Sequence, residues 1–284
     1  MAIIIMAYKD PEQIKRLVTR MNHPSFDFYI HVDKKINIEP FLFLGKMERV
    51  FIATTRYEII WAGYSLVKAM LSCTKEIMNS RQHYDFISTF SGQDYPLQPI
   101  NSIVDYYSQR LGHSFFSLED DDSSWWSHAV TRVNKYHFTD FKFRGRYKFQ
   151  YLVNRILPKR TFPIFKKLYG GPCATFWTMS HDCAGYVIDF LEKNMSLRRF
   201  AKFTWACDEF LIPTIVMNSH FRNSVINDNG RYIDWSRGGS NPKILGSEDF
   251  DQIMSSGKLY ARKFDLKVDT KILDEIDQSI VQQH

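Results

Sequence analysis

The sequence IIIMAYKDP, residues 3–11, sets the fold class of this chain. A short apolar run rich in β-branched residues predicts a strand that is buried on both faces. Asp10 is suited to cap a helix that has Pro11 at its first position, where a proline loses no hydrogen bond. The sequence therefore predicts a strand over residues 3–7 that leads into a helix reaching about Met21.

The alternation of strand and helix continues through the first 118 residues. We expect strands at residues 26–32, 49–53, 84–90 and 113–118, and helices at residues 64–79 and 100–110. This alternation predicts an α/β fold with a mostly parallel central sheet flanked by helices. Ligands of such sheets bind beyond the carboxyl ends of the strands, and polar clusters around Asp33 and Asp94 lie at two of these ends.

The second half of the chain is less regular. Between residues 120 and 170 we expect loops and a single helix, at residues 147–157. Farther along, the patterns predict strands at residues 176–179, 231–235 and 258–264, and helices at residues 181–194, 208–218 and 270–281.

Residues 132–167 form a basic and aromatic segment. It holds eleven Lys and Arg against a single acid, Asp140, so it carries +10 in a chain whose net charge is +6. Seven rings are interleaved with the charges: Tyr136, Phe138, Phe141, Phe143, Tyr147, Phe149 and Tyr151. Nucleic acid, a membrane surface or a polyanionic acceptor would suit this composition, and a solvated basic face is the alternative.

Cysteine usage and hydropathy bear on the compartment. The four cysteines match no metal-binding spacing and are too few for a disulfide framework in a chain of 284 residues, which predicts a reducing compartment. The apolar start lacks the basic flank of a signal peptide, and no apolar run is long enough to span a membrane. We expect a cytoplasmic protein that contacts the inner face of a membrane peripherally.

Several motifs, taken together and in order, resemble those of the core-2/I-branching β-1,6-N-acetylglucosaminyltransferase and peptide O-xylosyltransferase family, glycosyltransferase family 14. They run from about residue 3 to residue 277, and it is their collinear order that is specific. The motifs are His31-Val32-Asp33-Lys34, Arg56 with Trp61-Ala62-Gly63-Tyr64, Phe86 to Leu97 (FISTFSGQDYPL), Asp208-Glu209, Arg231-Tyr232-Ile233-Asp234-Trp235, and Tyr260-Ala261-Arg262-Lys263-Phe264.

The resemblance implies a GT-A-like fold, a UDP-sugar donor, inversion at the anomeric carbon and independence from a metal ion. It also implies two fused halves: a nucleotide-sugar-binding half over residues 1–118, and an acceptor-binding and catalytic half over residues 119–284. The chain departs from the family where Phe176 precedes Trp177, because xylosyltransferases resemble one another in having an acid there. This departure argues against a peptide acceptor of the xylosyltransferase type. The absence of an anchor and of many cysteines fits a bacterial member.

Glu209 is the candidate catalytic residue. An acceptor hydroxyl needs a base to take its proton as the glycosidic bond forms, and the family has this role at the position of Glu209. The alternative is an acid that only favours the positive end of a helix. Asp208 would orient Glu209, bind near the sugar or acceptor, or cap the helix.

Arg262 and Lys263 are the candidate diphosphate site, and Val32, Asp33 and Arg56 the candidate nucleotide site. Arginine offers a planar fork to phosphate oxygens and lysine a compact charge. Two adjacent side chains of a strand point to opposite faces, so we expect a turn or bulge at Arg262. The alternatives are a surface basic pair, a turn cap at Asp33 and a surface ion pair at Arg56.

Gln93, Asp94 and Trp177 are the candidates for holding the donor sugar or the acceptor. Gln93 and Asp94 follow Gly92, where the backbone can come close to a ligand, although Asp94 could instead cap the next helix. Trp177 would stack on an acceptor sugar or pack in the core. The acidic run Asp120-Asp121-Asp122 contains the D-x-D pattern of a metal site, but the resemblance assigns no metal there and we expect a solvated loop.

Together these observations predict an inverting glycosyltransferase that works without a cofactor. It moves a sugar, GlcNAc in our interpretation, from a UDP-sugar to a hydroxyl of a glycan acceptor, for which a lipid-linked glycan is one option. A xylosyl- or other hexosyltransferase on the same scaffold is one alternative. A basic nucleic-acid-binding protein is the alternative from another class, but no standard nucleic-acid motif accompanies the basic segment, so we expect no nucleic-acid partner.

Overall fold

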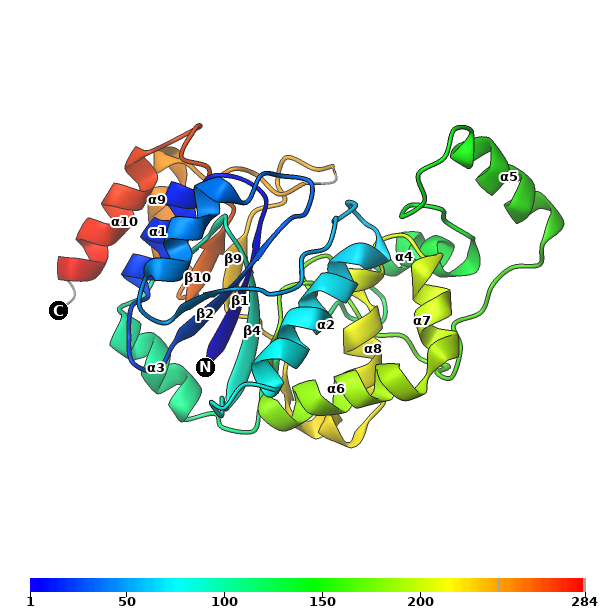
Figure 1. The fold of residues 1–284 in the computed structure, drawn as a ribbon, viewed down its shortest axis with the longest axis horizontal. Coiled ribbons are helices and arrows are strands. Elements are labelled where there is room, and N and C mark those ends of the chain that lie inside the picture. Colours follow the sequence, from blue (N-terminus) through cyan, green and yellow to red (C-terminus); the bar gives the residue numbers. More distant parts are fainter. Residues whose placement is uncertain (240, 283–284) are drawn as a thin grey trace.

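A seven-stranded sheet forms the centre of the computed structural model, which describes residues 1–239 and 241–282 (Figure 1). The order across the sheet is β3-β2-β1-β4-β7-β6-β8. Neighbours from β3 to β4 are parallel, as are β6 and β8, while β7 is antiparallel to both of its neighbours. The strands are β1 (Ala2–Ala7), β2 (Asp27–Val32), β3 (Val50–Ile52), β4 (Phe86–Ser91), β6 (Ser114–Phe115), β7 (Thr178–Ser180) and β8 (Val225–Ile226). The expected α/β fold with a mostly parallel sheet is confirmed.

The central strand β1 is buried on both faces, which explains its uninterrupted apolar sequence. Ile3, Ile5 and Ala7 pack into one core, whereas Ala2, Ile4 and Met6 pack into the other. The first core is covered by α1 (Pro11–Arg20), η1 (Glu39–Lys46), α3 (Ile100–Ser108), α9 (Phe250–Ser255) and α10 (Lys271–Gln282). The second is covered by α2 (Tyr64–Met78), α6 (His181–Lys193), α7 (Met195–Lys202) and α8 (Leu211–Met217).

A second, three-stranded sheet joins the two ends of the sequence. It consists of β5 (Asp94–Pro96), β10 (Tyr260–Arg262) and β9 (Arg231–Ile233), with β10 in the middle. β10 is antiparallel to β5, and its register pairs Arg262 with Asp94. Because both sheets contain strands from before and after residue 118, the two predicted halves are interleaved in one unit.

The structure corrects several expected elements. Residues 120–170 contain α4 (Trp125–Asn134) in addition to α5 (Arg146–Ile156), and α4 buries only Ala129 and Val133, too few for a clear apolar period. The helix expected at residues 208–218 is split into η2 (Cys207–Glu209) and α8, because Phe210 between them has an extended φ of −143°. The remaining short helices are η3 (His220–Ser224) and η4 (Ser247–Asp249).

Asp10 precedes α1 as expected, but its side chain makes no capping hydrogen bond. Its backbone is left-handed, with φ of 49°, and its carboxylate instead contacts the ammonium groups of Lys267 at 3.5 Å and Lys9 at 3.9 Å. The prediction of a side-chain cap is therefore wrong, although the helix start at Pro11 is right.

The buried amide of Gln13 connects the main sheet to the end of β10. Its Nε2 donates to the carbonyls of Gly92 at 2.9 Å and Phe264 at 3.1 Å, and its Oε1 accepts from the backbone amide of Leu266 at 3.1 Å. A single side chain on α1 thus fixes both the turn after β4 and the segment after β10.

Replacing Gln13 with Leu should destabilise the protein by about 2–4 kcal/mol, because the Gly92 carbonyl and the Leu266 amide would lose their side-chain partner and the Phe264 carbonyl would keep only Gln93. The free energy of unfolding from urea titration measures this cost. Glu12→Leu is the matched control, since Glu12 lies on the same helix with its side chain largely exposed and should change stability by less than about 0.5 kcal/mol. Equal effects of the two substitutions would contradict the role given to Gln13.

Candidate functional site

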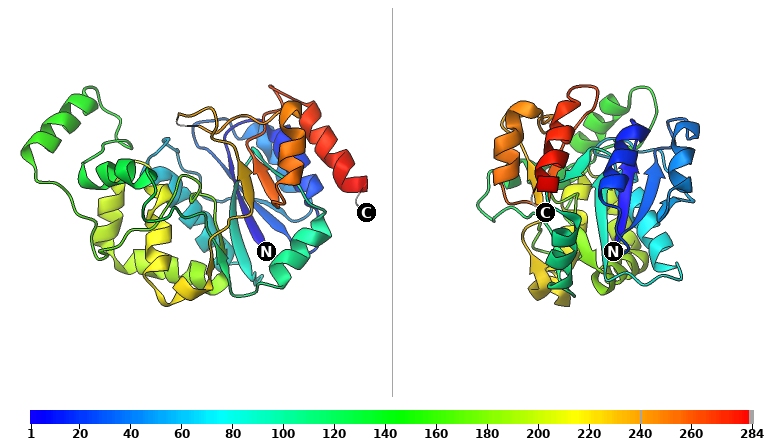
Figure 2. Two further views of the ribbon diagram at one scale, coloured as in Figure 1. Left: turned by 180° about the vertical axis from the view of Figure 1, so that it is seen from behind. Right: turned by 90° about the vertical axis from the view of Figure 1, so that its left-hand side faces the viewer.

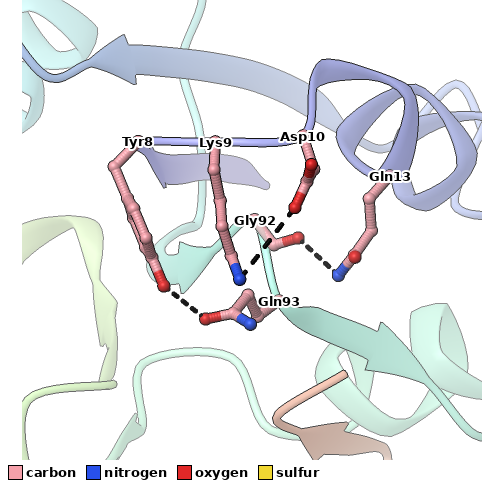
Figure 3. Close-up of a pocket in the computed structure, with 6 residues that line it drawn as sticks. All are labelled: Tyr8, Lys9, Asp10, Gln13, Gly92 and Gln93. Carbon is pink, nitrogen blue, oxygen red and sulfur yellow. Dashed lines mark hydrogen bonds and ion pairs between the residues drawn. The ribbon is translucent and has the colours of Figure 1, made fainter. Parts of the chain in front are cut away.

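The carboxyl ends of β1 and β4 meet in a shallow hollow (Figure 3). It is lined by Tyr8, Lys9, Asp10, Gln13, Gly92 and Gln93. The Tyr8 hydroxyl donates to Oε1 of Gln93 at 2.6 Å, and Nε2 of Gln93 donates to the Phe264 carbonyl at 2.9 Å. Gln93 therefore ties the ends of β1, β4 and β10 together, and its amide has both of these partners within the protein.

Three cations lie close together beside this hollow: Lys9, Arg262 and Lys263. The Lys9 ammonium contacts Asp265 at 2.5 Å, whereas Lys263 has no ion-pair partner among residues 1–239 and 241–282. Burial lowers the pKa of Lys263, and the positive charges of Arg262 and Lys9 lower it further. Mutual repulsion of this kind marks a place where a bound anion would be stabilised. β10 ends at Arg262, so Lys263 lies just beyond the strand, where we expected the regular alternation to stop.

Asp94 holds Arg262 in place and does not contact an open cavity. Its side chain is 0% exposed, its Oδ2 accepts from the backbone amide of Ser91 at 2.5 Å, and its Oδ1 lies 3.5 Å from Nε of Arg262. The guanidinium of Arg262 also lies 3.8 Å from the ring centroid of Phe176. The expected contact of Asp94 with a sugar is therefore wrong in this structure, and so is the alternative helix cap, since Pro99 occupies the N-cap position of α3.

The candidate nucleotide residues lie together at the end of β2. Asp33 is buried and accepts from the backbone amides of Lys35 at 2.9 Å and Ile59 at 3.4 Å. The guanidinium of Arg56 donates to the carbonyls of Val32, Asp33 and Ile36. Asp33 thus acts as the turn cap considered above. Arg56 stabilises the end of the strand and forms no ion pair with any residue that the structure describes. Whether these residues also contact a nucleotide stays a prediction.

Glu209 lies in a second cluster, at the end of η2. Its side chain is 20% exposed and pairs with the guanidinium of Arg132 from α4. Burial raises the pKa of the Glu209 carboxyl to about 7, Asp208 adds to the rise, and Arg132 opposes it. The Arg132 guanidinium is itself positioned over the Trp205 ring, 4.5 Å from its centroid. A carboxyl that titrates near neutral pH can accept and release a proton there.

Asp208 precedes Glu209 and belongs to the same cluster. Its Oδ2 accepts from the Thr175 hydroxyl at 2.6 Å, and burial raises its pKa. Its side chain does not cap α8, so the helix-cap alternative is wrong. Because the pKa of Glu209 responds to Asp208, the two neighbouring acids act as one electrostatic unit.

Two glycines fix the backbone of Glu209. The Gly171 amide donates to the Glu209 carbonyl at 3.1 Å. A Cβ added to Gly170 would lie 2.3 Å from that same carbonyl oxygen, a distance that forces backbone to move. The close approach therefore requires glycine at position 170, and it fixes the backbone from which the Glu209 side chain extends.

Residues 173–176 link the Glu209 cluster to the cation cluster. Thr175 binds Asp208, and the next residue, Phe176, stacks on Arg262. Burial raises the pKa of the Cys173 thiol, which also senses the charges of both Arg262 and Glu209. One short segment thus places a proton acceptor and a set of fixed cations in a common neighbourhood.

Trp177 does not line this neighbourhood. It is 1% exposed and packs in the second core, with its backbone amide donating to the Thr89 hydroxyl at 3.0 Å. The prediction that Trp177 stacks on an acceptor sugar is therefore wrong, and the core alternative is right. Its apolar neighbours Ala174 and Met179 are equally buried, which is the pattern of a core strand.

The acidic run Asp120–Asp122 lies in the turn before α4, where Asp121 pairs with Lys167 at 2.6 Å. Within residues 1–239 and 241–282, no three His, Cys, Asp or Glu side chains are grouped so that they could hold a metal ion. In the same ranges no helix has the length and apolarity needed to cross a membrane.

A larger hollow, of about 670 Å³, lies between α2, α6 and α7. Its wall mixes cations and acids, among them Lys68, Arg198, Glu58 and Asp140. It contains neither Glu209 nor the cations at the end of β10, so it is separate from the two clusters described above.

Sequence reasoning missed Arg132, Lys9 and Trp205. Arg132 stands 77 positions before Glu209, in a segment expected to be loop, and was counted only as part of the basic segment. Lys9 is the second residue beyond the end of β1, where the rule that ligands bind beyond strand ends could have identified it. No sequence signal distinguishes Trp205 from a core aromatic residue.

Residues 1–254 match the Core-2/I-Branching enzyme family, and the chain belongs to that family. Xylosyltransferase sqv-6 of Caenorhabditis briggsae is 24% identical to it over 302 residues, covering 95% of this chain and 35% of that protein. The β-1,3-galactosyl-O-glycosyl-glycoprotein β-1,6-N-acetylglucosaminyltransferase of Homo sapiens is 24% identical over 312 residues, covering 98% of this chain and 69% of that protein. The family expected from the motifs is confirmed.

The chain spans about a third of the length of the xylosyltransferases that it matches. Among solved structures, apo mouse xyloside xylosyltransferase 1 aligns over 92% of this chain and 97% of its own, with 9% identity and a TM-score of 0.41. The organisms of these relatives are animals, and the bacterial origin expected from the sequence stays a prediction.

Proposed function

We propose that this chain transfers a sugar from a UDP-sugar to a hydroxyl of a glycan acceptor, with inversion at the anomeric carbon and Glu209 as general base. The observation that carries the proposal is the Glu209 carboxyl, which is largely buried beside Arg132 and whose pKa is raised by this burial to about 7. An efficient general base has a pKa near the working pH, and an ordinary exposed glutamate lies far below it.

The proposed transfer is a single displacement at the anomeric carbon. The acceptor oxygen forms a bond to the anomeric carbon as the bond to the β-phosphate oxygen breaks, and the hydroxyl proton passes to Oε of Glu209. UDP leaves with the electron pair of the broken bond. Arg132 would stabilise Glu209 in its ionised form, since it lowers the pKa of that carboxyl.

Arg262 and Lys263 are proposed to meet the negative charge that grows on the leaving diphosphate. Fixed cations in a water-poor site stabilise developing charge without rearranging during the reaction. Arg262 is oriented by Asp94 and Phe176, and Lys263 has no ion-pair partner among the residues described. Lys9 extends the same positive region toward the end of β1. No metal ion is needed in this account, and metal independence is part of the proposal.

GlcNAc is our proposed donor sugar and xylose the second candidate, because relatives named for each transfer match most of this chain. Phe176 at the position before Trp177 favours a glycan over a peptide acceptor, as argued from the sequence. Gln93 contributes by fixing Tyr8 and the end of β10, at the floor of the donor site.

Replacing Glu209 with Gln should lower transfer by about a hundredfold or more, the usual loss when a general base is removed. The wild-type rate should rise with pH through about 7, as the carboxyl ionises, and this rise should be absent from the variant. Transfer is measured with UDP-GlcNAc and, in parallel, with UDP-xylose as donor. Affinity for UDP, measured by calorimetry, should barely change.

Thermal unfolding serves as the control for Glu209→Gln. The folded pKa of about 7 exceeds the unfolded value of 4.5, so the wild type loses stability as the pH rises through that window. The Gln variant should therefore be at least as stable as the wild type above pH 7. Near wild-type transfer by a folded variant would remove Glu209 from its proposed role, and faster transfer from UDP-xylose would overturn GlcNAc as the donor.

Transfer should persist in excess EDTA, whereas Arg262→Lys and Lys263→Ala should each weaken UDP binding by about tenfold and slow turnover. A lost charge-assisted hydrogen bond has about this effect. Lysine at position 262 keeps the charge but loses the planar fork, so it separates geometry from charge.

Lys267→Ala is the matched control, because Lys267 lies only four residues beyond Lys263 with its side chain 77% exposed. Its UDP affinity should equal that of the wild type. If EDTA abolishes transfer and manganese restores it, the fixed-cation account is wrong and the Asp120–Asp122 turn becomes the leading candidate for a metal site.

A further inference from the structure

Helix α5, at the centre of residues 141–169 (the α5 region), stands away from the rest of the molecule. Figures 1 and 2 show α5 at one end of the long axis, joined to the body by two extended connections. No residue of α5 is buried, and residues 141–169 contain no acid at all. Packing against the protein core therefore adds almost no stability to this helix. We infer that its sequence is suited to contact with something outside the protein core.

The inward side of α5 makes several polar contacts, beside the packing of the Phe149 ring on Phe138. Oε1 of Gln150 accepts from the backbone amide of Phe138 at 2.9 Å, and Oδ1 of Asn154 accepts from that of Tyr136 at 2.7 Å. The guanidinium of Arg146 donates to the carbonyl of Phe141 at 3.0 Å. These three side chains attach α5 to the segment that precedes it.

The outward side of α5 exposes large apolar and aromatic side chains, with two cations among them. The exposed fraction is 69% for Tyr147, Tyr151 and Ile156, and 50% for Leu152. Eight of the seventeen exposed large apolar side chains found in the described residues fall between positions 143 and 164. Large apolar side chains on the outward side are the reverse of the arrangement in a helix whose outer face meets only water.

The eleven cations of the basic and aromatic segment, residues 132–167, divide into two groups. Five have partners: Arg132 pairs with Glu209, Lys142 with Glu58 and Lys167 with Asp121, while Arg160 is buried against backbone carbonyls and Arg146 is bound as described above. Six others are exposed and have no ion-pair partner within the ranges described: Lys135, Arg144, Lys148, Arg155, Lys159 and Lys166. Of these, Lys148 and Arg155 lie on the outward side of α5 among its exposed rings.

We propose that the outward face of α5 docks this protein on an anionic lipid surface. A membrane interface receives apolar and tyrosine side chains together with flanking cations, and a helix of this composition lies in its plane. The aliphatic side chains of Leu152 and Ile156 are unsuited to nucleic acid, whose bases and phosphates call for stacking and charge. The absence of any acid from the region complements a surface of uniform negative charge better than a protein surface of mixed charge.

Docking would bring the Glu209 cluster toward the membrane, because α4, which leads into this region, carries Arg132. A lipid-linked acceptor would then reach the base from the membrane side. This consequence rests on the proposed function, whereas the docking itself does not.

Co-sedimentation with vesicles tests the proposal without any turnover. Wild-type protein should pellet with phosphatidylcholine vesicles that contain about 30% phosphatidylglycerol, and should pellet much less with pure phosphatidylcholine. Raising the salt from about 0.1 M to about 0.5 M should release it, since screening shortens the reach of the charges. Lys148→Glu/Arg155→Glu should lower the partition coefficient by about twentyfold or more, and Tyr147→Ser/Tyr151→Ser/Ile156→Ser should also lower it.

Lys46→Glu/Lys271→Glu is the matched control: both lysines are exposed, the charge change is the same, and α10 lies at the end of the molecule opposite α5 (Figure 1). Its partition coefficient should fall far less. Equal losses in the two double variants, or equal pelleting with neutral vesicles, would overturn the proposal. A wild-type dimer, detected by light scattering, that the Ser variant dissociates would also overturn the proposal, because the face would then bind a second copy.

UDP-sugar hydrolysis without vesicles should be equal in wild type and α5 variants, so a failure of docking and a failure of the proposed activity are distinguishable.

Discussion

The site depends most on the environment of the Glu209 carboxyl, which is largely buried but has only one cation, Arg132, to offset the burial. Burial and the neighbouring Asp208 push its pKa up, while the single cation Arg132 pulls it down, and the balance lies near neutral pH. A fully paired carboxylate would be a poor proton acceptor, and a fully isolated one would stay protonated. The rest of the site preserves this balance: Gly170 and Gly171 fix the backbone, Thr175 binds Asp208, and α4 delivers Arg132.

The positions of the cations at the end of β10 depend on a different constraint, which is the pairing of strands from opposite ends of the sequence. β10 lies between β5 and β9, so that Arg262 is paired in register with Asp94 and stacked on Phe176. Gln13 and Gln93 then hold the segment after β10 against the ends of β1 and β4. The positive charges are therefore placed by hydrogen bonds formed on folding, before any ligand arrives, which is the condition for efficient electrostatic stabilisation.

The sequence predicted the elements whose periodicity is strong and missed those held by distant contacts. The apolar run of β1, which must face two cores, predicts its burial directly, and the motif order predicts the family that residues 1–254 confirm. Trp177 and Asp94 were misassigned because a residue type at a strand end does not reveal whether its side chain turns inward, and both turn inward. Arg132 could not be paired with Glu209 from sequence, because 77 residues separate them and α4 lacks a clear apolar stripe. The roles of Glu209, Arg262 and Lys263 stay predictions, although the structure brings their clusters close to the shared segment 173–176.

The protonation of Glu209 in the folded protein is the most direct test of this account. Protein carrying ¹³C-labelled glutamate carboxyls can be titrated by NMR, with Glu209→Gln identifying the signal of Glu209 by its loss. We expect a Glu209 carboxyl that titrates near pH 7, and a higher midpoint in Arg132→Gln, because Arg132 lowers the pKa in the wild type. Lys135→Gln, three residues away and exposed, should leave the midpoint unchanged. A Glu209 signal that titrates near pH 4.5, as in an exposed glutamate, would contradict the account.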